Sequence, residues 1–218
     1  MTQPRAYIRQ RSGLRLNLLD PDPNSWTDED LAIGLARTFR WGGHSIWPLP
    51  LSVAQHSLSV MILFAKFAPK PPTPAEALRE LAHDADESLI GGFDAIGPVK
   101  PFLGQGFLDL TVKLQQAVFA RYNLVQWTPA EHRDHKHADI LAAASEAVHV
   151  AGWSLAEVRD TLKIHLTPLL TDPLAELYDC RPWEPWAPDV AAERFLAELT
   201  RLTEQVRAPA PKAVHAAS

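Results

Sequence analysis

The sequence predicts an all-α fold with a small β-hairpin at its N-terminus. In most of its 218 residues, apolar side chains recur at helical spacing, and Ser, Thr, Pro and Gly stand where such segments begin and end. No strand and helix segments alternate as in an α/β sheet, and no internal repeat is present. Residues 5–19 instead alternate polar with apolar around Ser12-Gly13, which is typical of a short hairpin.

The helices expected after this hairpin share strong start signals. Three of them begin with Ser or Thr followed three residues later by Glu or Gln, which predicts capping boxes at Ser52, Thr73 and Thr128. The helix that starts at Ser52 is apolar on nearly all sides and is expected in the centre of the core. The full set of predicted helices is 27–41, 52–68, 73–90, 106–124, 128–151, 154–166 and 189–206.

Composition and charge limit the class of protein. The net charge of −5 argues against a nucleic-acid polymer as partner, because such binding needs clustered Lys and Arg. No apolar run reaches the ~18 residues of a membrane span, the start has no signal-peptide pattern, and the one cysteine, Cys180, excludes an internal disulfide. A cytoplasmic protein without membrane contact is expected. Its parts are residues 1–25 (hairpin and turn), 26–152 (core), 153–207 (helical extension packed on the core) and 208–218 (disordered tail).

The segment LAHDADESLIGG, residues 81–92, carries side chains that can hold a metal ion. On one continuous helix, His83, Asp84 and Glu87 project into a single sector. A His-Asp pair by itself is weak evidence, because chance makes this dipeptide common. However, His56 and Asp139 also lie in apolar helices, where a buried carboxylate needs a partner or a metal. One ion bound by His56, His83, Asp84 and Asp139 would satisfy all four.

The order of these motifs resembles a known family. SVAQHSL supplies a His on one helix, LAHDADE a His-Asp pair on the next, and HKHADIL a lone Asp on a later helix. This order is similar to that of the HD-domain metal-dependent phosphohydrolases. Arg40-Trp41 and the segment HDADESLIGGFDAIGPVK further resemble the bacterial and phage members related to deoxynucleoside 5′-nucleotidases. The resemblance covers roughly residues 5–150 and implies an HD-domain helical bundle.

The resemblance implies that a metal-activated water attacks a phosphate group of a small (deoxy)nucleotide. The expected cofactor is a divalent transition metal, Mn, Co or Zn, with Mg as an alternative. Glu87 or Asp94 would orient the water and move a proton. Asp94 stands in for an acid that the family usually has where this chain has Gly92. Relatives of this type assemble, so a homo-oligomer is expected.

Candidate substrate contacts each have a simpler interpretation. Arg40 is expected to clamp phosphate, or else to be a cation at a helix C-terminus. Lys100 is a second phosphate contact or a loop cation, and Trp41 either stacks on the base or sugar or packs in the core. His44 is a further candidate for reaching the phosphates. By contrast, the strongly charged surroundings predict solvated side chains for the histidines His132, His135 and His137.

Three classes of function remain open on the sequence. The first is a nucleotide phosphohydrolase, either a 5′-monophosphate nucleotidase or a deoxynucleoside triphosphate triphosphohydrolase of the dATP type. The second is an HD oxygenase with a paired iron centre, which calls for additional His ligands. The third is a regulatory module in which the metal is structural and nothing is turned over.

Overall fold

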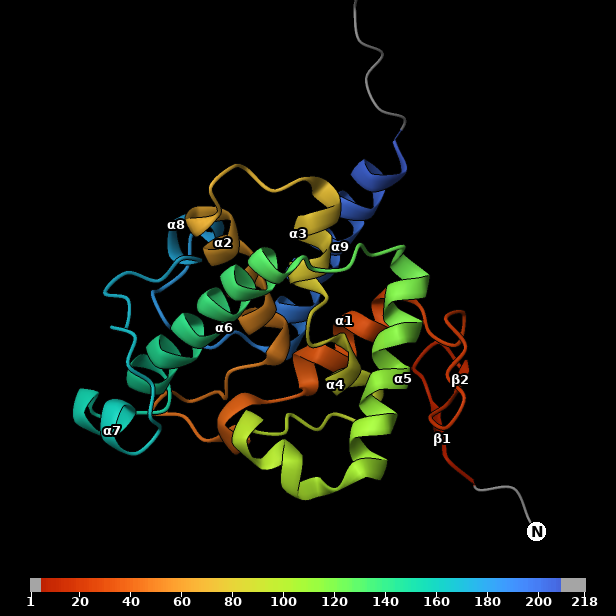
Figure 1. Ribbon diagram of the computed structural model, residues 1–218, viewed down its shortest axis with the longest axis horizontal. Coiled ribbons are helices and arrows are strands. Elements are labelled where there is room, and N and C mark those ends of the chain that lie inside the picture. Colours follow the sequence, from red (N-terminus) through yellow and green to blue (C-terminus); the bar gives the residue numbers. More distant parts are fainter. Residues whose placement is uncertain (1–4, 209–218) are drawn as a thin grey trace, which may run out of the picture.

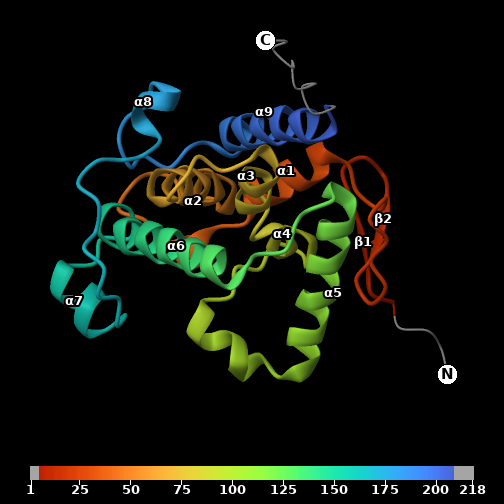
Figure 2. The same cartoon turned by 45° about the horizontal axis from the view of Figure 1, so that its top comes forward.

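The computed structural model describes residues 5–208 and shows a bundle of helices with a two-stranded hairpin at one side (Figures 1 and 2). The predicted all-α class with a small N-terminal hairpin is therefore confirmed. None of the helices within residues 5–208 is both long and apolar enough to cross a membrane. Most of the predicted tail, from residue 209 onwards, lies outside the described residues.

The elements follow each other along the chain with short connections. They are β1 (Tyr7–Arg9), β2 (Arg15–Asn17), α1 (Asp28–Arg37), the 3-10 turn η1 (Arg40–Gly43), α2 (Val53–Phe67), α3 (Pro74–Leu81), α4 (Ala85–Leu89), the 3-10 turn η2 (Gly97–Leu103), α5 (Gln105–Tyr122), α6 (Pro129–His149), α7 (Leu155–Asp160), α8 (Ala175–Tyr178) and α9 (Pro188–Arg207).

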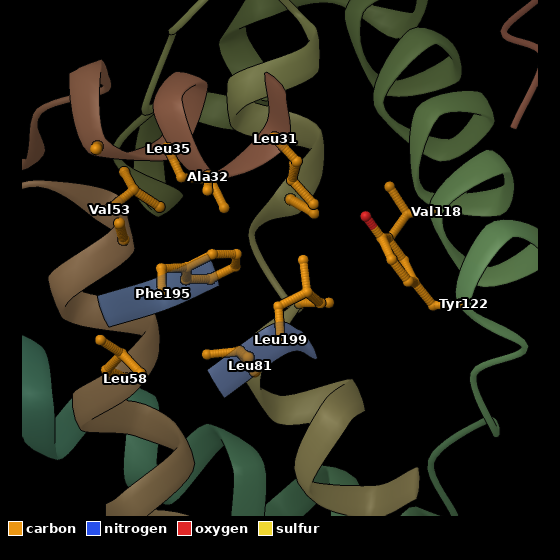
Figure 3. Packing of buried hydrophobic residues seen from close by; sticks show 14 of the residues in the cluster. Leu31, Ala32, Leu35, Val53, Leu58, Leu81, Val118, Tyr122, Phe195 and Leu199 are labelled. Carbon is orange, nitrogen blue, oxygen red and sulfur yellow. The ribbon is translucent and has the colours of Figure 1, made fainter. Parts of the chain in front are cut away.

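The main core lies between α1, α2, α3 and α9. Figure 3 shows Phe195 and Leu199 of α9 among side chains of the N-terminal helices, including Leu35, Leu58 and Leu81. All five are fully buried. The last helix is thus part of the main core, because one of its faces supplies large side chains to the same cluster as the first three helices.

The first helix is shorter than predicted. It ends at Arg37, and Arg40 and Trp41 form a separate 3-10 turn instead of closing the helix. The physical reason is a backbone pairing: Arg40 N donates to Leu51 O at 2.9 Å, and Val53 N donates to Thr38 O at 2.9 Å. These bonds draw the chain away from helical geometry. Arg40 is therefore not a cation in the last turn of α1.

The predicted helix 73–90 is broken in two at residues 82–84, between α3 and α4. The break coincides with a side-chain bond, in which Nδ1 of His83 lies 2.8 Å from the Glu80 carbonyl. In an unbroken α-helix that carbonyl would accept from the amide of residue 84. His83 and Asp84 therefore project from a turn, and the helical angles expected from their spacing do not apply.

Two further expectations about helices are corrected. Ser52 accepts a hydrogen bond from Gln55 N, but the side chain of Gln55 does not complete the capping box. It instead bonds to the backbone of Glu184 and Trp186, which fixes the segment before α9 against α2. The apolar residues of the predicted helix 106–124 are buried only in its second half: Val112 is 50% exposed, whereas Leu114 and Val118 are buried. The start of α5 and η2 stand away from the core (Figure 2).

The packing of α9 against the core can be tested through Phe195. Replacing this fully buried ring in Phe195→Ala should lower the free energy of unfolding by about 3–5 kcal/mol, the usual cost of removing a large aromatic side chain from a core. Urea denaturation followed by circular dichroism measures the change. Leu170→Ala is the matched control, because Leu170 is 91% exposed and its truncation should change stability by less than about 0.5 kcal/mol. Equal effects of the two variants would contradict the packing of α9 in the core.

Candidate metal centre

The structure brings the four predicted metal ligands together from three parts of the chain. His56 lies in the first turns of α2, His83 and Asp84 lie in the turn between α3 and α4, and Asp139 lies in α6. Oδ2 of Asp84 is 3.0 Å from Nε2 of His83 and 3.7 Å from Nε2 of His56. Oδ1 of Asp139 is 3.3 Å from Nε2 of His56. Ligand atoms of His56, His83 and Asp84 thus lie within 4.8 Å of one another, and Asp139 adjoins this group through its contact with His56.

The chemistry of these atoms fits a divalent cation. Nε2 of His56 and Nε2 of His83 are buried, and neither has a hydrogen-bond partner of suitable geometry within the described residues. In both rings Nδ1 is engaged instead, by Oε1 of Glu146 at 2.6 Å and by the Glu80 carbonyl at 2.8 Å. A ring that donates from Nδ1 leaves the Nε2 lone pair free to bind a metal.

The spacing of the ligand atoms also suits a metal ion. Ligands bound at about 2.0–2.2 Å in tetrahedral or octahedral geometry lie about 3.0–3.5 Å from one another. The separations of 3.0 Å between His83 and Asp84, 3.7 Å between His56 and Asp84, and 3.3 Å between His56 and Asp139 are close to this range. Mixed imidazole and carboxylate ligands are typical of sites for Zn, Mn, Co or Fe.

The charges of the cluster are strongly coupled. Burial and Arg40 oppose protonation of His56, but Glu146 and Asp139 outweigh them and raise its pKa to about 9. Burial alone would raise the pKa of Asp84, yet His83 and His56 hold it below its usual range. The pKa of Asp139 is likewise lowered by His56 and His83, against burial. The two carboxylates therefore stay charged beside the two imidazole rings.

Glu146 of α6 is a functional candidate that the sequence reasoning missed. Its Oε1 accepts from His56, while its Oε2 accepts from Nε of Arg40 at 2.8 Å and lies 3.3 Å from Nε1 of Trp41. Although burial opposes ionisation, Arg40 and His56 lower the pKa of Glu146 to about 2. A signal was present: Glu146 is a lone carboxylate in an Ala-rich, buried half-helix, two turns beyond Asp139 and on the same face.

A second buried hydrogen-bond network lies beside His83. His135 is 3% exposed, and its Nδ1 lies 2.7 Å from Oε2 of Glu80. Oε1 of Glu80 accepts from Nε1 of Trp127 and from Nε of Arg79. The prediction of a solvated side chain is therefore wrong for His135, because the charged residues of its segment lie on other faces of α6 and Glu80 supplies a buried partner.

The two other histidines of that segment, His132 and His137, are exposed as expected. The ring of His135 instead lies 5.0 Å from that of His83, measured between centroids. Glu80 therefore contacts both rings, His83 through its carbonyl oxygen and His135 through its carboxylate.

The two candidate acids lie beside the cluster. Burial, followed by the charges of Asp84 and Asp94, raises the pKa of Glu87 to about 9, and Oε1 of Glu87 is 3.5 Å from Nζ of Lys100. Oδ2 of Asp94 is 3.9 Å from Nη1 of Arg40. Gly92 has a φ of 76°, which a side chain at that position would adopt only with strain. The chain thus turns at a glycine and returns an acid to the site two residues later.

A cavity of about 850 Å³ opens beside these groups. At the metal end it is lined by Asp84, Asp139 and both candidate acids, together with the predicted substrate contacts Arg40, Trp41 and Lys100. His44 is exposed and is not among the residues that line the cavity in the described part of the chain. The remaining lining comes from residues 95–98, from Arg133, Lys136, His137, Ile140 and Ala143 of α6, and from residues 162–166, which follow α7.

Metal binding can be tested through thermal stability. Mn²⁺, Co²⁺ or Zn²⁺ at about 100 times its Kd should stabilise the chelator-treated protein by about 2.7 kcal/mol, which corresponds to a rise in Tm of roughly 5–10 °C. Asp84→Asn keeps the size of the side chain but removes its charge, and it should lose most of this rise. Asp160→Asn, at an exposed acid, is the control and should keep it. A rise of the same size in Asp84→Asn would exclude Asp84 as a ligand.

Comparison with other sequences places the chain in a family. No protein-family model matches it. A protein of Rhodobacter capsulatus, described as uncharacterized, is 43% identical to it over 154 residues, a stretch that makes up 70% of this chain and 77% of the relative. The chain therefore belongs to the same family as this Rhodobacter capsulatus protein.

Proposed function

We propose that this protein is a metal-dependent phosphohydrolase of the HD-domain type that acts on (deoxy)nucleotides. One observation carries the proposal. The Nε2 atoms of His56 and His83, which have no hydrogen-bond partner within residues 5–208, lie near two carboxylates at one end of a cavity that Arg40 and Lys100 also line. Ligands for a cation and donors for a phosphate are thus combined in one cavity.

The charge of the cavity supports an anionic substrate. Five cationic side chains line it, against four carboxylates, although the whole chain carries a net charge of −5. A divalent ion at the candidate metal centre would make the excess of positive charge larger. Local positive charge in an otherwise acidic protein favours a small anion such as a phosphate ester over an extended polyanion. The cations concerned are Arg40, Lys100, Arg133, Lys136 and Lys163.

The residues at the metal end have distinct roles in the proposed reaction. When bound, a divalent metal acts as a Lewis acid and lowers the pKa of its water. Arg40, held at Nε by Glu146, is oriented to donate its remaining N–H groups to phosphate oxygens. Glu87 and Asp94 flank the site and can hold or transfer a proton of the attacking water or of the leaving group. Lys100 neutralises charge beside Glu87.

A second candidate function is triphosphohydrolysis of a deoxynucleoside triphosphate. The observation in its favour is a row of cations on α6. Lys136 lies one turn before Asp139, with its Nζ 3.0 Å from Oδ2 of that residue, and Arg133 lies about one turn further out. These cations could bind the phosphates of a triphosphate that lie away from the metal end. A monophosphate would make no use of them.

Product analysis tests the proposed function. Purified protein reconstituted with Mn²⁺, Co²⁺, Zn²⁺ or Mg²⁺ should release inorganic phosphate from nucleoside monophosphates, or triphosphate from deoxynucleoside triphosphates, and phosphate chromatography distinguishes the two. Asp84→Asn should abolish either activity while circular dichroism still shows the helices, and Asp160→Asn should be fully active. Release of pyrophosphate alone would exclude both reactions. Two tightly bound irons per chain would favour the oxygenase, and metal binding without turnover would favour a regulatory module.

Arg40→Lys tests the phosphate clamp while it keeps the charge beside Glu146. A lysine cannot bond to Glu146 and present a planar pair of donors to phosphate, so kcat/KM for the nucleotide should fall by roughly 10- to 100-fold, the usual value of a hydrogen bond to a charged group. Steady-state kinetics measures the loss. Arg37→Lys, at an exposed cation of the same helix-turn region, is the control. Equal kinetics of Arg40→Lys and the wild type would leave Arg40 a structural role only.

A further inference from the structure

The far end of the cavity differs in character from the metal end. Along α6, Ile140 follows Asp139 directly. Ala143 lies about one turn beyond Asp139, or about 6 Å from it along the helix axis. Ile140 is 41% exposed although it lines a cavity. The cations of α6 lie in the opposite direction from Asp139, so one helix presents a charged side and an apolar side to the same space.

The segment after α7 lines this apolar end. Residues 162–166, LKIHL, alternate: Leu162, Ile164 and Leu166 are half-buried, whereas Lys163 and His165 are exposed, and all five line the cavity. Leu162 and Ile164 pack against the buried cluster of Ala144, Ala147 and Val158. Trp41 packs against this same cluster, and it also lines the cavity.

Two residues of the cavity lining, Trp41 and Lys163, have an uncommon backbone conformation. Trp41 and Lys163 each have a φ of 57°, in the left-handed region that non-glycine residues rarely adopt. Residues in such regions persist where the surroundings over-determine them, and they cluster at ligand sites. Hydrogen bonds fix the segment at Lys163, since Leu162 N donates to Glu157 O and Ile164 N donates to Val158 O. These hydrogen bonds to α7 thus hold the segment in one backbone conformation.

The size of the cavity exceeds what the metal end requires. About 850 Å³ is typical of a pocket for a whole small molecule, which buries most of the ligand against apolar side chains and a few polar groups. A phosphate group would occupy only the region of Arg40 and Asp84. The rest of the cavity, which α6, residues 95–98 and residues 162–166 line, would be left without a ligand against its apolar side chains.

We infer that residues 162–166, with Trp41 and Ile140, form the wall that binds the nucleoside part of the substrate, with Ile164 as a specificity-determining residue. The inference rests on the proposed function, because the phosphate at the metal end sets the position of the nucleoside. A planar base offers the apolar faces that this wall can cover. Lys163, which forms no ion pair within the described residues, is placed at the edge of the wall.

The test uses two ligands that cannot be turned over, a deoxynucleoside and inorganic phosphate. Calorimetric titration of the metal-reconstituted protein should show binding of both. Ile164→Asp should weaken binding of the deoxynucleoside at least tenfold, because loss of a small apolar contact in a pocket changes affinity by roughly 10- to 200-fold, and should leave phosphate binding unchanged. Leu155→Asp is the matched control, since Leu155 lies in α7, is 64% exposed and is not among the lining residues.

The outcomes separate this inference from the proposed function. If the protein binds phosphate but no deoxynucleoside, or if Ile164→Asp weakens binding of both equally, the inference of a nucleoside-binding wall is wrong. The proposed hydrolase function would not be affected. Deoxynucleoside binding that depends on Ile164, in a protein that hydrolyses no nucleotide, would uphold the wall and overturn the hydrolase. Binding of neither ligand would overturn the wall as well. Ile164→Ala, checked by circular dichroism, gives the same comparison with less risk to folding, and its effect should have the same direction.

Discussion

The carboxylate of Glu146 joins the parts of the site that are furthest apart in the sequence. One oxygen is bonded to Nδ1 of His56, and the other is bonded to Nε of Arg40. Because the group is buried and accepts only from charged or polar donors, its two partners are held in fixed positions relative to each other. A metal ligand and a phosphate donor are thus oriented by a single side chain of α6, and any movement of this helix would displace both.

The break between α3 and α4 also depends on one local contact and also positions several groups of the site. His83 takes the Glu80 carbonyl that would otherwise continue the helix, so its Nε2 and the carboxylate of Asp84 face the same point. The carboxylate of Glu80 is hydrogen-bonded to Nδ1 of His135 in α6. Helix α6 is therefore connected to α2 through Glu146 and His56, and to α3 through His135 and Glu80.

The candidate metal centre and the cavity wall show how the two halves of the chain share one site. The N-terminal helices supply ligands and acids, whereas the segment after α7 supplies the apolar end of the cavity. Helix α9 contributes no lining residue within the described chain, but it fills the core under α1 and α2 (Figure 3). The C-terminal part is thus needed both for stability and for the shape of the pocket.

Much of the fold could be predicted from the sequence because its signals are local. Apolar periodicity and capping residues predicted α2, α6 and α9 closely, and Ser12-Gly13 predicted the hairpin. The motif order also singled out His56, His83, Asp84 and Asp139, since buried charged groups need partners. Glu146, by contrast, was overlooked among alanines, and the histidine pattern of α6 was misjudged for His135, because burial depends on which face meets another helix.

The sequence by itself determined the helical class, the hairpin and the residue types that can bind a cation. Those features follow from backbone propensity, apolar spacing and side-chain chemistry, which need no knowledge of distant contacts. Only the tertiary structure decided that the helix breaks at His83, that Asp94 lies beside Arg40 in the cavity lining, and that Glu146 bonds to both His56 and Arg40. Each of these depends on hydrogen bonds or packing that position side chains in three dimensions, and no local pattern encodes them.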